Sequence, residues 1–418
     1  MVSSGPLEAE LSGARSGAPP LAGLRVLDLG HHIAAPYGTR LLAACGAHVV
    51  KLERPRSGDL MRWIGPFAGD EPGADRGLAF LDLNVNKLGI TLNLACATGR
   101  ELMLELVRAS DIVVESFRPG TLERFGLGYD SLARVNPAIV LTSVSNFGQS
   151  GPYRDMPASE LVLYAMGHAM HGTGHIDASP ASVAPRLDLA LAGHTAAVGA
   201  MAAALGAGLH GQGDWIDVSI METMLSSIDR RADSLTAFAY SGDKFERARW
   251  DEDRMVPSTY SRCSDGWVVC SHALTPATWA AFVRGVGDPW WEDPRFVPPL
   301  ADDALRTELR ERWATWCSEH TKVEITERMQ TAGFSCAPVN AIDAVVNDPA
   351  LEARGYFADV EHPLLGTVRH PGLFAKFADT PGRIVSPAPR LGEHNALVYG
   401  ELGLDREDLA ALAAAGVI

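Results

Sequence analysis

Short apolar runs alternate with amphipathic stretches through roughly the first 150 residues. The run "LRVLDL" (24–29) lies between two glycines, which predicts a buried strand. The stretch "YGTRLLAAC" (37–45) has helical spacing, and "AHVVKLE" (47–53) predicts the next strand. A strand, a helix and a strand in this order form a βαβ unit, which implies a parallel sheet with a right-handed crossover.

The same alternation continues downstream. Further strands are predicted at 90–94, 111–117, 138–147 and 214–220, and helices at 98–110, 159–171 and 188–206. Strands that alternate with helices are typical of a doubly wound α/β domain, so we predict a Rossmann-like parallel sheet.

The residue composition of the chain changes after about residue 225. Seven of the nine tryptophans lie between residues 250 and 316, which suggests a separate smaller domain with its own aromatic core. After about residue 335 the chain returns to segments punctuated by Pro and Gly. We therefore expect a disordered leader (1–19), a large domain (20–224), a small domain (225–334) and a C-terminal segment (335–418).

Charge and cysteine content narrow the class of protein. The formal net charge of −15 argues against partners that are nucleic acids or anionic membranes, because both require positive charge on the protein. The six cysteines form no CxxC and no Cys/His cluster with zinc spacing, so we expect no metal site and reduced thiols in a cytoplasmic protein.

Two segments could be mistaken for a signal peptide or a membrane span. The leader lacks the apolar core of a signal peptide, which is why we expect it to be disordered. Residues 189–209 are apolar enough to imitate a membrane span, but they are rich in Ala and Gly. We expect a buried helix that packs closely through these small residues.

The loop "GHHIAAP" follows the first strand, at the edge where open α/β sheets bind ligands. A dinucleotide fingerprint needs GxGxxG here, and only Gly30 and Gly38 are present, so classical NAD or FAD binding is disfavoured and no redox cofactor is expected. His31 and His32 are adjacent, which is poor geometry for two ligands of one metal. A single loop histidine is more often structural than catalytic.

Several cations also lie in or near predicted strands. They permit two interpretations: a phosphate site gripped by forked hydrogen bonds, or solvated charge in surface loops. Spacing alone favours solvated charge. The residues are Lys51, Arg54, Lys87, Arg118 and Arg124.

Two carboxylates are equally ambiguous. Asp177 lies in the turn-rich stretch "GTGHIDASP", where Asp commonly forms local hydrogen bonds, and only a minority of such residues do chemistry. Glu160 opens an apolar helix, where it is either a first-turn acid favoured by the helix dipole or an active-site carboxylate.

Taken together, several long motifs resemble those of the class III CoA-transferases. This family includes formyl-CoA:oxalate CoA-transferase and belongs to a superfamily with the α-methylacyl-CoA racemases. The motifs are "LAGLRVLDLGHHIAAPYGTRLLAACGAHVVKLERPRSGD", "NVNKLGITLNL", "DIVVESFRPGTLERFGLGYDSL", "NPAIVLTSVSNFGQSGPYRD", "HGQGDWIDVSIMET" and "PGRIVSPAPRLGEHN". They stand in the family's order and cover nearly the whole chain from about residue 20.

The resemblance implies an architecture and a ligand. The C-terminal segment would return to the large Rossmann-like domain, the Trp-rich block would be an inserted α+β domain, and two chains would form an interlocked homodimer. Acyl-CoA would be a substrate, not a resident cofactor. The residues implied at the CoA site are His31, Ile33, Ala34, Arg54, Leu92, Asn93, Ala95, Ser116, Phe117, Arg118, Arg124, Ser145 and Phe147.

The resemblance also implies a nucleophile. The family uses an Asp that follows a Gly-rich turn, and reading without gaps from Glu160 places it at Asp177. Its carboxylate would attack an acyl-CoA thioester, and CoA would then pass through an aspartyl-CoA thioester to an acceptor acid.

Departures from the family pattern restrict the substrate. Positions that are Lys, Tyr and Gln in the formyl-CoA branch are Ser145, Phe147 and Ile33, so we expect a bulkier or more apolar acceptor than oxalate. The Gly-rich loop of that branch is not evident between residues 240 and 262.

Three alternatives remain open. The racemase alternative places its base pair at Ser159 and Asp188, so its histidine is missing. A transferase/lyase and a non-catalytic CoA-binding subunit are the other two.

Overall fold

A computed structural model describes residues 17–182, 184–227, 231–242, 244, 260–270, 275–300 and 302–418. Contacts divide the chain into two compact units, which are described separately below. The larger unit comprises the described residues of Met1–Gly174, Pro180–Glu246 and Arg354–Ile418, and the smaller one those of His175–Ser179 and Arg247–Ala353. The predicted domain limits at residues 225 and 335 stay predictions, and most of the predicted leader lies outside the described residues.

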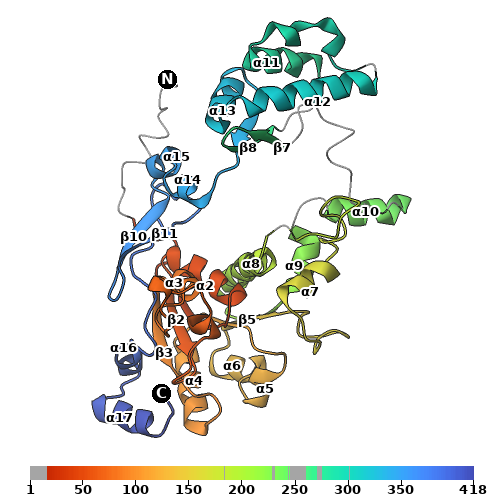
Figure 1. Cartoon of the computed structure of the whole chain (residues 1–418). Coiled ribbons are helices and arrows are strands. Elements are labelled where there is room, and N and C mark those ends of the chain that lie inside the picture. The colour runs from red at the N-terminus through yellow and green to blue at the C-terminus, as the bar shows by residue number, and fades with distance from the viewer. Residues whose placement is uncertain are drawn as a thin grey trace. The chain divides into compact units, whose positions relative to one another are not determined.

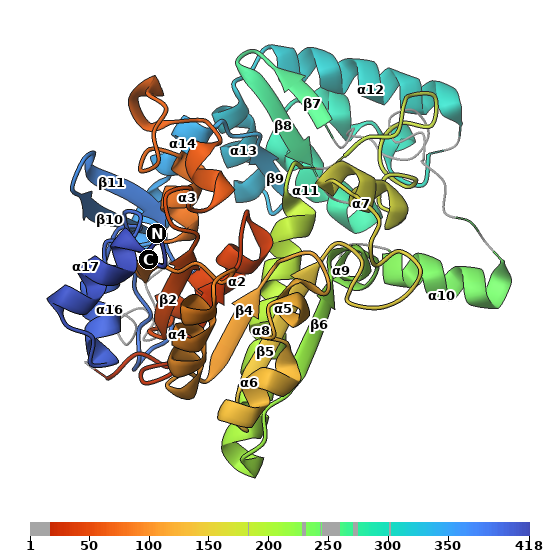
Figure 2. The ribbon, with the colours of Figure 1, turned by 90° about the horizontal axis from the view of Figure 1, so that it is seen from below.

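The larger unit is built on a six-stranded parallel sheet (Figure 2), as the alternating pattern predicts. The strand order is β3-β2-β1-β4-β5-β6, which is that of a doubly wound Rossmann-like fold. The third strand begins three residues earlier than predicted. The strands are β1 (Arg25–Leu29), β2 (His48–Glu53), β3 (Lys87–Thr91), β4 (Ile112–Glu115), β5 (Val140–Ser145) and β6 (Trp215–Ser219).

Helices cover both faces of this sheet because its strands are apolar on both sides. One face packs against α2 (Ala34–Ala44) and α8 (Leu187–His210). The other packs against α4 (Ala97–Arg108), α5 (Thr121–Arg124), α6 (Tyr129–Val135), α16 (Asn395–Glu401) and α17 (Arg406–Ala414), and Figure 1 shows α16 beside β3. Thus the last helices of the chain complete the core of the first domain.

The remaining elements of the larger unit are shorter. They are the 3₁₀ turns η1 (Leu60–Trp63) and η2 (Ala68–Asp70), the helices α3 (Leu78–Leu83), α7 (Glu160–Met166), α9 (Ile220–Ser227) and α10 (Arg231–Ser241), and an antiparallel pair, β10 (Phe357–His362) with β11 (Gly366–Pro371).

Helix α8 packs against α2 through glycine, as expected. A Cβ at Gly193 would lie 2.5 Å from the Ala34 carbonyl oxygen, so the two backbones touch. The expectation that this helix is buried is wrong for most of its length, however. Only 22% of its most apolar window is buried, and the helix is long and apolar enough to cross a membrane by length and composition alone.

The smaller unit has a separate core of aromatic and sulfur-containing side chains. Phe282 lies within 5.5 Å of the rings of Trp279, Trp291, Trp313 and Phe334. Its elements are an antiparallel sheet of β7 (Tyr260–Cys263), β8 (Gly266–Cys270) and β9 (Cys336–Pro338), the helices α11 (Pro276–Val286), α12 (Asp303–Ser318), α13 (Lys322–Thr331), α14 (Ile342–Val346) and α15 (Pro349–Ala353), and the turns η3 (Pro289–Glu292) and η4 (Pro294–Phe296).

Candidate active site

The strand order reverses between β1 and β4, and the loops that follow these two strands meet at this switch point. The His31 amide donates a hydrogen bond to Ser116 Oγ over 2.8 Å. The rings of His31 and Phe117 lie 5.5 Å apart. Ligands of open α/β sheets bind in this position, so the structure brings together three predicted site residues from two distant segments.

The predicted arginines lie at the same carboxyl edge and are exposed. Arg54 directly follows β2, while Arg118 and Arg124 follow β4. Arg124 donates a hydrogen bond to Thr121 Oγ1 over 2.8 Å. Exposed guanidinium groups beyond parallel strand ends are available to bind an anion.

Other predicted residues present little or no side chain to solvent. Leu92 and Ala34 pack in the two cores of the sheet, and the aromatic ring of Phe147 packs near Tyr153. Ser145 Oγ is buried with no hydrogen-bond partner among the described residues. Ile33 is half-buried and packs near Met61.

Asn93 and Ala95 belong to a turn fastened to the C-terminus. The Asn93 amide donates to the carbonyl oxygen of Val417 over 2.7 Å, and the Ala95 amide donates to Asn93 Oδ1 over 3.1 Å. Only Ala95 is exposed. The turn therefore offers a ligand mainly backbone and a methyl group.

Both interpretations of Lys51 and Lys87 are wrong, because these lysines lie inside the protein. Lys51 Nζ is 3.0 Å from Asp59 Oδ2, and Lys87 Nζ is 2.9 Å from Asp28 Oδ2. All four side chains are buried. An ammonium group can be buried when a carboxylate neutralises it, and sequence spacing does not reveal that partner.

This polar core shifts the ionisation of its members. Burial opposes ionisation of Asp28, but the charges of Lys51 and Lys87 outweigh it and lower its pKa to about 2. Burial lowers the pKa of Lys87 to about 8, against the attraction of Asp28. Asp28 and Asp59 were not singled out from the sequence. An acid inside the apolar run "LRVLDL" was the available signal.

Asp177 is exposed and belongs to the smaller unit. Its side chain is 61% exposed, and its carboxylate lies 3.8 Å from His175 Nδ1. The Asp177 backbone amide donates to that same nitrogen over 3.2 Å. Both contacts join residues of the same turn.

Asp188 has the opposite environment. It lies in the first turn of α8 and is only 2% exposed. Its Oδ2 atom is buried with no hydrogen-bond partner among the described residues. Burial raises the pKa of this carboxyl group, and the negative charge of Glu160 raises it further. A buried carboxylate oxygen without a hydrogen-bond partner is costly in stability, so it commonly marks a functional site.

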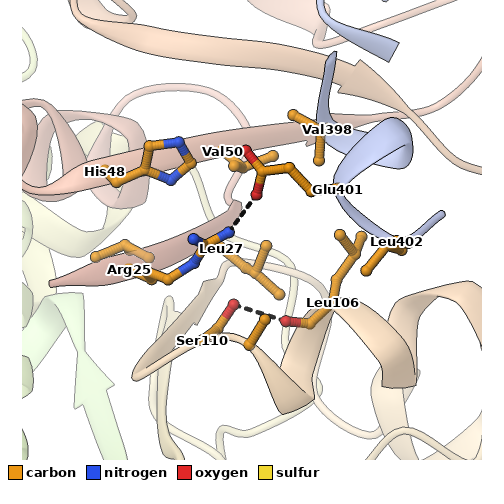
Figure 3. Close-up of a pocket in the computed structure, with 11 residues that line it drawn as sticks. Arg25, Leu27, His48, Val50, Leu106, Ser110, Val398, Glu401 and Leu402 are labelled. Atoms are coloured by element: carbon orange, nitrogen blue, oxygen red, sulfur yellow. Dashed lines mark hydrogen bonds and ion pairs between the residues drawn. The ribbon is translucent and has the colours of Figure 1, made fainter. Parts of the chain in front are cut away.

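The clearest cavity lies at the opposite edge of the sheet (Figure 3). It has a volume of about 240 Å³ and is lined by the first residues of β1 and β2, with α4 and α16. An ion pair of 2.7 Å joins Arg25 to Glu401 there. None of the predicted site residues lines it. Elsewhere in the described part of the chain, no group of three metal-binding side chains is found.

Comparisons with known proteins show the family of this chain. The sequence profile described as CoA-transferase family III matches residues 21–395. The chain belongs to this family. A formyl-CoA:oxalate CoA-transferase of Streptomyces avermitilis is 33% identical over 416 residues, covering 95% of this chain and 99% of the relative. A succinyl-CoA–D-citramalate CoA-transferase of Chloroflexus aurantiacus is 33% identical over 403 residues, covering 96% and 98%.

Solved structures agree with the sequence relatives. A CaiB/BaiF family protein from Brucella suis has a TM-score of 0.83 and 26% identity, covering 92% of this chain and all of its own. Rv3272 from Mycobacterium tuberculosis has a TM-score of 0.73 and 27% identity, covering 91% and 99%. The protein is thus a family III CoA-transferase in fold and in enzyme class, and acyl-CoA is the substrate of that class.

Proposed function

We propose that this enzyme moves CoA from an acyl-CoA donor to a carboxylic acid through a covalent aspartyl intermediate. The observation that carries the proposal is the burial of the Asp188 carboxylate, whose Oδ2 atom has no hydrogen-bond partner among the described residues. Asp188 lies in the same compact unit as the switch-point loops. Its burial leads us to propose Asp188 as a candidate nucleophile. Asp177, which the family resemblance implies, stays the other candidate.

The proposed chemistry needs only a carboxylate and CoA. An Asp188 oxygen attacks the thioester carbonyl, the C–S bond breaks, and an acyl-aspartyl anhydride and CoA thiolate result. The thiolate attacks the aspartyl carbonyl and releases the donor acid, leaving aspartyl-CoA. The acceptor carboxylate attacks that thioester, and the thiolate then attacks the acceptor's carbonyl, which restores Asp188. A raised pKa makes the carboxylate a better nucleophile.

Access to Asp188 requires movement. A side chain that is 2% exposed cannot meet a thioester until the neighbouring chain is displaced. We therefore expect acyl-CoA binding to open this part of the enzyme.

The exposed arginines support a site for the CoA phosphates. Arg54, Arg118 and Arg124 are the proposed phosphate ligands, and the loop that carries His31 and Ile33 would contact the rest of CoA. The apolar side chains of Ile33 and Phe147 favour an acceptor bulkier or less polar than oxalate.

Trapping identifies the nucleophile. The enzyme is incubated with succinyl-CoA, formyl-CoA and bulkier acyl-CoAs, treated with hydroxylamine, and digested for mass mapping. We expect the adduct on Asp188, and we expect Asp188→Asn to reduce CoA transfer by at least about 10³-fold. Asp177→Asn is the matched control. If Asp177 carries the adduct and Asp188→Asn still transfers CoA, Asp177 is the nucleophile.

The homodimer is proposed from the uncovered face of α8. Val198, Leu205 and Leu209 lie on one side of the helix and are 70%, 66% and 70% exposed. A continuous apolar stripe of this kind commonly marks a protein interface. We expect Leu205→Glu to shift the enzyme from dimer to monomer in light scattering. Leu397→Glu on α16, where the native side chain is 54% exposed, is the control.

The interlocked form of the dimer, the insertion of the smaller unit and a cytoplasmic location complete the proposal. All six cysteines are free, which is consistent with a reducing compartment.

The racemase alternative lacks a second base. Ser159 precedes α7 at the position where a racemase would need its histidine. Deuterium uptake at the α-carbon of a branched acyl-CoA without CoA exchange would favour the racemase.

A further inference from the structure

Buried charged side chains form hydrogen bonds to the backbone of the switch-point loop, Gly30–Ile33. Lys51 Nζ donates to the Gly30 carbonyl oxygen. Asp59 Oδ1 accepts the His32 amide over 3.2 Å. The backbone on both sides of His31 is therefore bound to one ion pair, Lys51 with Asp59.

The conformation of this loop is strained without such support. His32 has a φ of 64°, in the left-handed region that side chains other than glycine rarely adopt. A residue remains there only when its surroundings fix it, and functional sites often contain such residues. The hydrogen bond from the His32 amide to Asp59 is the contact that fixes it.

Asp59 also organises the packing beside the loop. Its Oδ1 accepts the Met61 amide over 2.9 Å, which begins η1. Met61 belongs to the apolar cluster against which Ile33 packs. The Asp59 backbone amide in turn donates to Glu53 Oε2 over 2.8 Å. Asp59 thus links the loop backbone, the apolar cluster against which Ile33 packs, and strand β2.

We propose that Lys51 and Asp59 are positioning residues for CoA binding, which hold the loop Gly30–Ile33 in the conformation that receives the ligand. The proposal rests on the proposed function, because it assumes that this loop contacts CoA. A buried ion pair contributes little net stability compared with apolar side chains of the same size, so geometry is the stronger reason for its presence.

The test uses the whole enzyme and free CoA as the probe. Asp59→Asn keeps the size of the side chain but removes its charge. The double variant Lys51→Met with Asp59→Leu removes both charges, which avoids leaving a buried ammonium unpaired. We expect each to weaken CoA affinity in calorimetry by at least about tenfold. KM for acyl-CoA should rise, while kcat at saturation stays within about threefold.

A second ion pair, in which Arg40 is buried and Asp82 is partly exposed, supplies the control. Arg40 and Asp82 lie 3.2 Å apart, and neither bonds to the loop. Arg40→Met with Asp82→Asn should leave the CoA affinity unchanged. A folded double variant at Lys51 and Asp59 with wild-type affinity would overturn the proposal.

Two further outcomes are decisive. If neither variant folds, hydrogen exchange on the wild type decides, since an unprotected His32 amide contradicts the bond to Asp59. If the wild type binds no CoA, the proposed function fails and not merely the role of Lys51 and Asp59.

Discussion

The two compact units bury very different side chains. The larger unit places lysines, aspartates, a glutamate and an arginine beneath its switch-point loop, each joined to a partner. The smaller unit buries tryptophans, phenylalanines and cysteines. Burial of apolar surface stabilises a fold without regard to direction, whereas a buried ion pair adds little stability but fixes orientation. The difference teaches that the polar core serves the geometry of a site and the aromatic core serves stability.

The largest effect is expected in the aromatic core. Phe282 is fully buried among four other rings, so Phe282→Ala leaves a cavity and lost ring contacts. We expect a loss of about 3–5 kcal/mol in the stability of the smaller unit, measured by urea unfolding with Trp fluorescence. Trp267→Ala is the control, because this side chain is 46% exposed. An equal loss in both variants would contradict the picture of a stabilising core.

An intermediate, pH-dependent effect is expected at Glu115, which ends β4 and accepts the Phe117 amide. Burial raises its pKa from 4.5 to about 7. The folded state therefore holds a proton that the unfolded state has lost, and the resulting stability is present below pH 4.5 and disappears as pH rises through about 7.

Glu115→Gln tests this sign. At pH 8 the variant should be more stable than the wild type by about 1–3 kcal/mol, and at pH 4.5 the two should agree. Thermal unfolding across this pH range provides the measurement. A wild type whose stability does not decline across this range would show that Glu115 is ionised at little cost.

The smallest effect is expected at the exposed ion pair of Arg25 and Glu401. Both side chains are more than two-fifths exposed, so water and salt screen their attraction. Glu401→Gln should change the free energy of unfolding by less than about 1 kcal/mol, with less effect at high salt. A loss as large as that at a buried pair would remove the distinction between the two environments.

Part of the candidate site was predictable from the sequence. Parallel strands end at one edge, so the ends of predicted strands must meet there. The family resemblance implied His31, Ser116 and Phe117 at the CoA site, and these residues do meet at that edge. Asp188 was noticed only as one half of a racemase pair, because nothing in the stretch "RLDLALAG" reveals a missing hydrogen-bond partner. The lysines were misread because the sequence does not show whether a cation near a strand is exposed or is buried beside a carboxylate.

By itself the sequence determined the alternation of strands and helices, the parallel sheet, the aromatic block and the family, because periodicity and long motifs are local properties of a chain. The tertiary structure decided which charges are buried, which carboxylate oxygen lacks a partner and which face of α8 is uncovered. These properties depend on residues far apart in sequence. Lys87 and Asp28 are separated by 59 positions, yet their side chains touch only because β3 and β1 belong to one sheet.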